Sequence, residues 1–305
     1  MATGWPMHRD VSTSRKDNIL AAGFMTASMA AITFNDTLMK LMAGDVPLYQ
    51  LLFLRGLITS ALVGLIAWRM GAFAVRITPK DRTRILVRSL ADTAAAYFFL
   101  TALFNMPLAN VTAIVQALPL TITLTAWAVL GEPVGWRRFL AIAVGLLGVT
   151  LIIRPGADDF TIYSLYAMSA VACVTARDLI TRTMSREVPS MLAVFANSAA
   201  IMIVFGLMTI PGDWAAMTPR TWGLTGSASV LIIGAYLFAV MVMRVGDISF
   251  VAPFRYTGLL WALILGYLVF GEWPAPLTLL GAGIVVASGL FMLYRETRAL
   301  RRAGK

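Results

Sequence analysis

The chain has 305 residues, of which 59% are hydrophobic and only 13% are charged, and its mean hydropathy is +0.79. Soluble domains carry about 25% charged residues, so this composition excludes a water-soluble globular protein. The net charge of +10 would suit a nucleic-acid-binding protein, but the long apolar blocks indicate basic loops on the cytoplasmic side of a membrane.

The apolar blocks, separated by Gly, Pro and charge clusters, predict an all-α membrane protein with ten transmembrane helices. The first five lie near 19–42, 47–67, 85–104, 107–130 and 137–153. The second five lie near 161–183, 190–210, 220–243, 248–270 and 277–294. Each block approaches the roughly 20 residues that cross a bilayer core. A polar tail at 1–17 and a basic tail at 295–305 remain, and no cleavable signal is expected.

Basic residues are distributed unevenly between the predicted loops. With the N-terminus inside, nineteen of the 25 Lys and Arg residues fall in inner segments and four lie within spans. The outer loops hold only Arg154 and Arg220. The positive-inside rule therefore predicts a multi-pass protein of the cell inner membrane with both termini in the cytoplasm.

The sequence repeats itself weakly. Gly131-Glu132 closes the fourth span, and Gly271-Glu272 closes the ninth span 140 residues later, with Leu140 matching Leu280 at the same offset. Because each unit holds five spans, the second must be inverted relative to the first. We expect one five-helix repeat at 18–155 and another at 156–294. Inverted repeats are typical of secondary transporters whose substrate site lies near the membrane midplane.

Charged residues within the spans are candidate functional residues, since each costs about 3 kcal/mol at the bilayer centre. The helical rise of about 1.5 Å per residue places Asp36 and Arg55 at similar depth near the outer face. It places Asp92 within reach of Arg177, next to Asp178, near the inner face. We expect these five residues to form ion pairs or gates. The alternative is that the pairs only tie neighbouring helices together.

A second group of polar residues lies near the midplane. Gln116 in the fourth span and Arg255 in the ninth are the deepest, and Tyr256 is the repeat partner of Gln116. Pro119 and Pro253 lie close by, and a proline inside a helix removes a backbone hydrogen bond and kinks or breaks the helix. We expect a substrate site here. Structural hydrogen bonding between helices is the alternative.

Several aromatic residues near this site could stack on a flat substrate ring: Tyr97, Phe98, Phe99, Trp127, Tyr236 and Trp261. Of these, Tyr97 and Trp261 are assigned to the substrate site. The alternative for each is that it fills a helix interface or the aromatic belt. The spacings Gly56-x3-Ser60-x3-Gly64 and Gly283-x3-Ala287 predict close helix packing.

The sequence also limits the chemistry. His8 in the N-terminal tail is the only histidine and Cys173 the only cysteine, so no His or Cys metal site is expected in the membrane. No nucleotide-binding loop and no G-x-S-x-G nucleophile motif occurs. We therefore expect no cofactor and no enzyme activity, with an intramembrane enzyme or a channel as alternatives. The expected partners are a small-molecule substrate and the lipid bilayer, without nucleic acid, in a monomer or homodimer.

Two segments carry a family resemblance: Gln116-Ala-Leu-Pro119 through Leu130-Gly-Glu132, and Phe250-Val-Ala-Pro253 through Phe270-Gly-Glu272. They resemble EamA-type members of the drug/metabolite transporter superfamily. The resemblance covers nearly the whole chain and implies a secondary active transporter that moves a small organic metabolite by alternating access.

The stretch from Ala176-Arg-Asp-Leu179 to Val188-Pro-Ser190 is similar to riboflavin-uptake members, so riboflavin uptake is the first activity expected. Export or exchange of amino acids or of metabolites like S-adenosylmethionine is the alternative that the resemblance leaves open.

Overall fold

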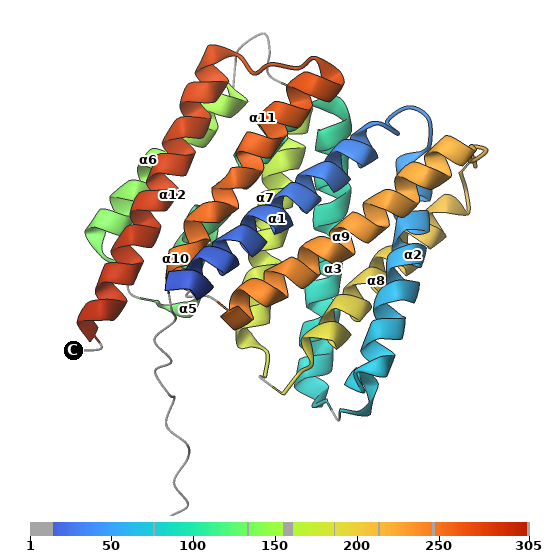
Figure 1. Ribbon diagram of the computed structural model, residues 1–305, viewed down its shortest axis with the longest axis horizontal. Coiled ribbons are helices and arrows are strands. Elements are labelled where there is room, and N and C mark those ends of the chain that lie inside the picture. The colour runs from blue at the N-terminus through green and yellow to red at the C-terminus, as the bar shows by residue number, and fades with distance from the viewer. Residues whose placement is uncertain are drawn as a thin grey trace, which may run out of the picture.

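The structure is a computed structural model that describes residues 15–75, 77–132, 134–154, 161–185, 187–212, 214–245 and 248–303. Helices joined by short connections form the bundle (Figure 1). In the first half these are α1 (Arg15–Lys40), α2 (Leu48–Arg69), η1 (Ala72–Ala74), α3 (Pro79–Asn105), α4 (Leu108–Val115), α5 (Leu118–Leu130) and α6 (Trp136–Ile153). In the second half they are α7 (Ile162–Thr183), α8 (Ser190–Thr209), α9 (Pro219–Val245), α10 (Ile248–Val251), η2 (Ala252–Tyr256), α11 (Thr257–Phe270) and α12 (Pro276–Ala303).

The described helices confirm an all-α membrane protein. Nine helical stretches within the described residues are long and apolar enough to cross a membrane, with α4–α5 and η2–α11 each counted as one. The tenth predicted span is α7, which has 22 residues but is less apolar because it carries Arg177, Asp178 and Arg182. It packs along α3.

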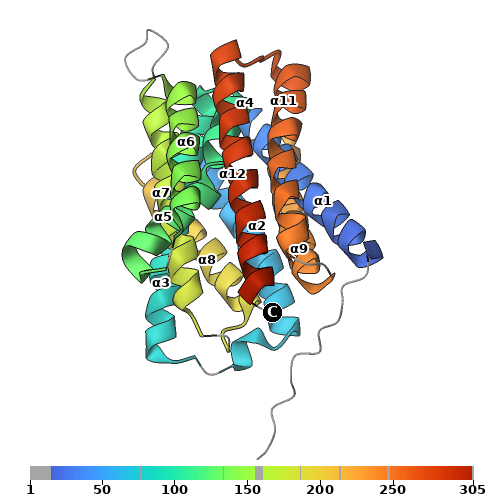
Figure 2. The same ribbon diagram turned by 90° about the vertical axis from the view of Figure 1, so that its left-hand side faces the viewer.

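The structure describes most of the predicted C-terminal tail and only the end of the N-terminal one. Residues 1–14, which include His8, lie outside the described residues, and α1 begins at Arg15. Helix α12 continues to Ala303, so most of the basic tail expected at 295–305 is helical. Both ends of the described chain lie at the same end of the bundle (Figures 1 and 2).

Each long helix of the first half packs against one helix of the second half. The main pairs are α1 with α9, α2 with α8, α3 with α7, and α6 with α12, while α4 contacts α11. In the first pair the Ser28 hydroxyl donates to the carbonyl of Ala235 at 2.9 Å, and Phe24 stacks on Phe238 with ring centroids 6.2 Å apart. Residues early in α1 therefore meet residues late in α9, and the two helices run antiparallel.

Two clusters of buried apolar residues hold these pairs together. One joins α6 and α12 to α4, α5 and α7 and includes Ile114 and Val285. The other joins α1, α2 and α3 to α8, α9 and α11 and includes Met39 and Phe205. Large apolar side chains such as Leu268 remain exposed on the outside of the bundle, as a lipid-facing surface requires.

Glycines allow the closest helix contacts. A Cβ on Gly148 of α6 would lie 2.8 Å from the carbonyl oxygen of Gly281 on α12, and a Cβ on Gly281 would lie 2.6 Å from the Gly148 oxygen. A Cβ on Gly56 would lie 2.9 Å from a backbone nitrogen of α8. The predicted packing role of Gly283 is wrong, since a Cβ there would meet no atom within 4 Å. The packing contact lies at Gly281, two residues earlier.

This difference predicts opposite effects for two neighbouring substitutions. Gly281→Ala should lower the free energy of unfolding by about 1–3 kcal/mol, because the added methyl group forces α6 and α12 apart. Gly283→Ala is the matched control and should leave stability unchanged or slightly improved. Thermal melting of the purified protein in detergent measures both, and equal melting temperatures for the two variants would contradict the packing described here.

Candidate substrate cavity

A cavity of about 330 Å³ lies between the two halves of the bundle. Pockets that bind small molecules typically have volumes of about 300–1,000 Å³. Its lining comes from α1–α5, α7–α9, η2 and α11, whereas no described residue of α6 or α12 lines it. The α6–α12 pair therefore takes no part in the cavity wall; Figure 2 shows these two helices side by side.

Five charged side chains line this cavity: Asp36, Arg55, Asp92, Arg177 and Arg255. Its other polar residues include Asn35, Gln116, Asn197 and Tyr236. The remaining wall is largely apolar and includes one aromatic ring from α3, Phe99. Charges within a membrane span are rare and usually mark a substrate or ion pathway. This cavity is therefore the candidate site of the protein.

Asp92, Arg177 and Asn197, which we call the closed cluster, are connected by short contacts. Arg177 Nη1 lies 2.6 Å from Asp92 Oδ1, and Asn197 Nδ2 donates to Asp92 Oδ2 at 2.5 Å. Arg177 Nε also donates to Asp178 at 2.9 Å, although Asp178 does not line the cavity. The closed cluster links α3, α7 and α8, and each of its charged groups is compensated. The proximity of Asp92 and Arg177 agrees with their expected depths.

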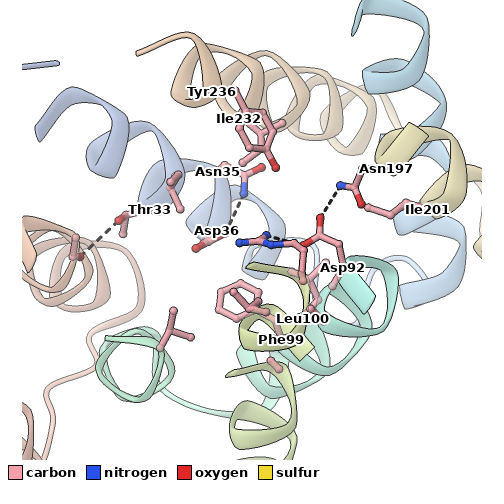
Figure 3. Close-up of a pocket in the computed structure, with 18 of the residues that line it drawn as sticks. Thr33, Asn35, Asp36, Asp92, Phe99, Leu100, Asn197, Ile201, Ile232 and Tyr236 are labelled. Atoms are coloured by element: carbon pink, nitrogen blue, oxygen red, sulfur yellow. Dashed lines mark hydrogen bonds and ion pairs between the residues drawn. The ribbon is translucent and has the colours of Figure 1, made fainter. Parts of the chain in front are cut away.

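Asp36 and Arg55 do not form the direct ion pair that their similar depth suggested. Asp36 is 8% exposed and accepts a hydrogen bond from Asn35 Nδ2 at 2.9 Å. No nitrogen of Arg55 lies within 4.0 Å of its carboxylate oxygens, yet both side chains line the cavity. The reason is helix packing, since α1 packs mainly against α9 and α11, and α2 mainly against α8 and α9. Figure 3 shows Asp36 and Asp92 directed toward the same space.

The predicted helix breaks coincide with the cavity. The fourth span is interrupted at residues 116–117, and Pro119 lies in the first turn of α5. The ninth span begins with α10 and the 3₁₀ helix η2, which contains Pro253. Gln116 Nε2 donates to the carbonyl of Arg255 at 3.4 Å, so the two interruptions meet. Irregular backbone at membrane depth is tolerated where it lines a cavity.

Three residues assigned to the substrate site lie elsewhere. The Tyr256 hydroxyl occupies the space where Gly289 of α12 would carry a Cβ, and Tyr256 is only 6% exposed. Tyr97 stacks on Tyr49 with ring centroids 6.0 Å apart. Trp261 contacts a phenylalanine of α1. These side chains pack at helix interfaces, which was the alternative interpretation of Tyr97 and Trp261. For Tyr256 the alternative was a structural hydrogen bond between helices, but its buried hydroxyl has no hydrogen-bond partner among the described residues. Of the six aromatic candidates only Phe99 and Tyr236 line the cavity.

Asn35 and Asn197 are cavity residues that the sequence analysis did not select. Each amide donates to a carboxylate, Asn35 to Asp36 and Asn197 to Asp92 (Figure 3). A lone amide within an apolar span is itself a signal, because it needs a polar partner in the membrane. The partner of Asn197 lies 105 residues away on another helix, and helical spacing within one span gives no information about such contacts.

The two Gly-Glu pairs end their helices in the same way. Gly131 and Gly271 both adopt left-handed backbone angles, with φ of 69° and 65°. The next residue, Glu132 or Glu272, donates its backbone N–H to a carbonyl six residues earlier, at 3.4 Å and 3.0 Å. Both helices therefore end on a left-handed glycine, which avoids the steric cost that other residues meet in this region. Each glutamate side chain is thereby placed at a helix end.

The two glutamates form ion pairs at opposite ends of the bundle. In the buried tie, Glu272 accepts from Lys40 Nζ at 2.6 Å and from the backbone N–H of Leu108 at 3.0 Å, which caps the start of α4. The side chains of Lys40 and Glu272 are 9% and 26% exposed. In the exposed tie, Glu132 lies 3.3 Å from Arg182, and both side chains are about half exposed.

A model of the EamA-like transporter family matches residues 19–154 and again residues 161–294. The chain belongs to the EamA-like transporter family. The two matches lie on either side of the connection between α6 and α7 and include nearly all of the described helices. Together with the apolar helices, this family membership identifies a multi-pass protein of the inner membrane.

Several EamA relatives are similar over much of the chain. The S-adenosylmethionine uptake transporter of Rickettsia conorii is 25% identical, covering 94% of this chain and 97% of that protein. The riboflavin transporter of Vibrio cholerae is 31% identical over 65% of this chain and 67% of that protein. The pseudopaline exporter CntI of Pseudomonas aeruginosa is 25% identical, with coverages of 89% and 95%. These names agree on metabolite transport and differ in substrate and direction.

A solved crystal structure supports the fold. It superimposes with a TM-score of 0.62 at 18% identity and covers 92% of this chain and 98% of its own. At this level of identity the likeness concerns the arrangement of helices and carries no information about substrate.

The closed cluster predicts a strong dependence of stability on Asp92. Asp92→Asn should lower the free energy of unfolding by roughly 3 kcal/mol, because Arg177 then keeps only one of its two carboxylate partners. The double variant Asp92→Asn/Arg177→Gln should recover part of this loss. Arg182→Gln, which breaks only the exposed tie, is the control and should cost less than about 1 kcal/mol. Thermal melting that ranks Arg182→Gln as the more damaging change would contradict this assignment.

Proposed function

We propose that this EamA-family protein is a secondary transporter that moves a small organic metabolite across the inner membrane by alternating access. The observation that carries the proposal is the cavity between the two matched halves, lined by five charged side chains at membrane depth. A site of this composition suits a polar solute with an apolar part. The absence of a nucleotide-binding motif in the sequence favours a carrier driven by gradients.

An inverted relation between the two five-helix units is part of the proposal. The pairing of helices supports it, because α1 packs on α9 while α3 packs on α7. Helices α1 and α7 are the first helices of the two units, and α3 and α9 are the third. The first helix of each unit therefore packs against the third helix of the other unit. The second helices pair with each other, as do the fifth. A two-fold axis in the membrane plane produces this exchange and makes every pair antiparallel.

The two glutamate ties are candidates for closing the two entrances. The buried tie fixes the ends of α1 and α11 to the start of α4, and the exposed tie lies at the ends of α5 and α7. With the expected N-in, C-in orientation, the buried tie lies on the outer side. Both ties are present in the described conformation. We propose that the buried tie holds the outer side closed, and that the exposed tie, whose side chains are half exposed to solvent, opens more readily. In this proposal the ties, and not the charged residues within the spans, act as gates. Asp36, Arg55, Asp92 and Arg177 instead form part of the cavity wall.

Riboflavin is the first substrate to test, because of the similarity noted in the sequence and the name of the Vibrio cholerae relative. The charged lining favours the alternative, an ionic metabolite of the amino acid or S-adenosylmethionine type, since riboflavin carries no charge at neutral pH. The name of the Rickettsia conorii relative is consistent with this alternative. Import and export are both compatible with the cavity.

Uptake into proteoliposomes tests the proposed function. The wild type should take up labelled riboflavin or labelled S-adenosylmethionine with saturation, and internal unlabelled substrate should stimulate uptake, as expected for a carrier. Gln116→Ala and Arg255→Ala should each reduce uptake at least about tenfold, because a hydrogen bond to a charged group contributes roughly 1.5–3 kcal/mol.

Arg137→Ala is the matched control, because Arg137 lies on α6 outside the cavity, and it should retain wild-type uptake. Wild-type kinetics in both cavity variants would contradict the assignment of the cavity. Failure of the wild type to take up or exchange either solute would count against both candidate substrates.

A further inference from the structure

The cavity contains a second cluster that corresponds to the closed cluster. Asp36, Arg55 and Tyr236, which we call the open cluster, come from α1, α2 and α9. The closed cluster comes from α7, α8 and α3. Each cluster thus draws on the first and second helices of one unit and on the third helix of the other unit. The two sets of three therefore occupy corresponding places in the two halves.

The two clusters differ in how their charges are compensated. In the closed cluster, both carboxylate oxygens of Asp92 accept hydrogen bonds from the other two members. In the open cluster no two members are joined by a hydrogen bond or salt bridge. Asp36 accepts only from its neighbour Asn35. The open cluster thus places an acid and a base on the cavity wall without direct contact between them.

Arg55 has the least satisfied charge of the open cluster. Its guanidinium carries five N–H donors, and no described residue accepts a hydrogen bond from them. A charge at membrane depth needs a partner or water, and the cavity is the space from which that partner can come. A planar guanidinium binds a carboxylate through two parallel hydrogen bonds. Asp36 and Asp92 lie within electrostatic range of Arg55 but make no direct contact with it, and a substrate carboxylate would supply that contact.

Asp36 limits what else the substrate can carry. A purely anionic solute on Arg55 would bring a second negative charge close to the Asp36 carboxylate. A solute that also carries an ammonium group would instead compensate Asp36. Such a solute neutralises both side chains without adding net charge to the cavity, which keeps the electrostatic cost of occupancy low.

We propose that Asp36 and Arg55 are substrate-binding residues that hold the ammonium and carboxylate groups of a substrate with an amino-acid-type head. This inference rests on the proposed transport function and specifies its substrate class. The apolar wall that includes Phe99 receives the rest of the molecule. The closed cluster, whose charges are already compensated, positions the helices around it.

The test compares solutes with and without the two charges. Proteoliposomes are given either a mixture of labelled amino acids, labelled S-adenosylmethionine, or labelled riboflavin. The first two probes carry both an α-ammonium and an α-carboxylate group, and riboflavin carries neither. The wild type should show saturable uptake of a probe that carries both charges, and decarboxylated S-adenosylmethionine, which lacks the carboxylate, should compete at least about tenfold more weakly than the intact compound.

The variant is the double substitution Asp36→Asn/Arg55→Gln, which removes both charges together. Asp36 and Arg55 have no direct contact with each other to lose, and each charge is costly at membrane depth, so this variant should melt no lower than the wild type. Its uptake of the doubly charged probe should fall at least about tenfold. Arg55→Lys, which keeps the charge but loses the planar fork, should retain part of the uptake.

Asp45→Asn/Arg220→Gln is the matched control, because these two residues form an exposed pair at 3.6 Å outside the cavity. It should transport like the wild type. Unchanged uptake of a doubly charged probe by the Asp36→Asn/Arg55→Gln variant would overturn the inference and leave the carrier function intact. Saturable uptake of riboflavin, without uptake of either doubly charged probe, would also overturn the inference and leave the carrier function intact. Absence of saturable uptake of every probe by the wild type, with the protein present in the vesicles, would overturn the inference and the proposed function together.

Discussion

The structure depends on one constraint: a charge inside the bilayer must have a partner or water. Asp92 and Arg177 meet this constraint through direct contact, and Asn197 satisfies the second carboxylate oxygen of Asp92. This contact fixes α3, α7 and α8 around one side of the cavity. The charges of Asp36 and Arg55 are left facing the cavity itself. The same physical requirement thus explains why one set of charges is compensated within the protein and the other set lines the cavity.

The interrupted helices follow from the same requirement. Pro119 and Pro253 prevent continuous α-helix at the positions where the fourth and ninth spans meet. Backbone groups released by such interruptions need polar neighbours, and the Gln116 amide supplies one to the carbonyl of Arg255. The broken segments therefore contribute to the cavity wall, while the uninterrupted α6 and α12 form a glycine-packed pair beside it.

Much of the fold could be predicted from the sequence because apolar length and charge distribution act locally. The span boundaries near Gly131 and Gly271 are fixed by glycine chemistry at helix ends, and depth along a helix follows from its rise. The estimated depths also predicted that Asp92 and Arg177 lie within reach of each other, as the structure shows. Similar depth also brought Asp36 and Arg55 to the same cavity, but without a direct contact, because α1 and α2 pack mainly on other helices.

The remaining differences arise from rotation about the helix axis. Tyr256 and Gln116 occupy equivalent positions in the repeat, yet Tyr256 packs against Gly289 of α12 while Gln116 lines the cavity. Position along the sequence sets the depth of a side chain, and only helix–helix packing determines which neighbour it faces. For the same reason the contacts of Asn197 could not be assigned in advance.

Access to the cavity from each face of the membrane tests alternating access most directly. A single cysteine at Ala96, which lines the cavity, is introduced into a Cys173→Ser protein and labelled with a membrane-impermeant maleimide applied to one face at a time. The account predicts labelling mainly from the face opposite the buried tie, and a shift toward the face of that tie when Glu272→Gln breaks it. Labelling from the same single face in both proteins would contradict it.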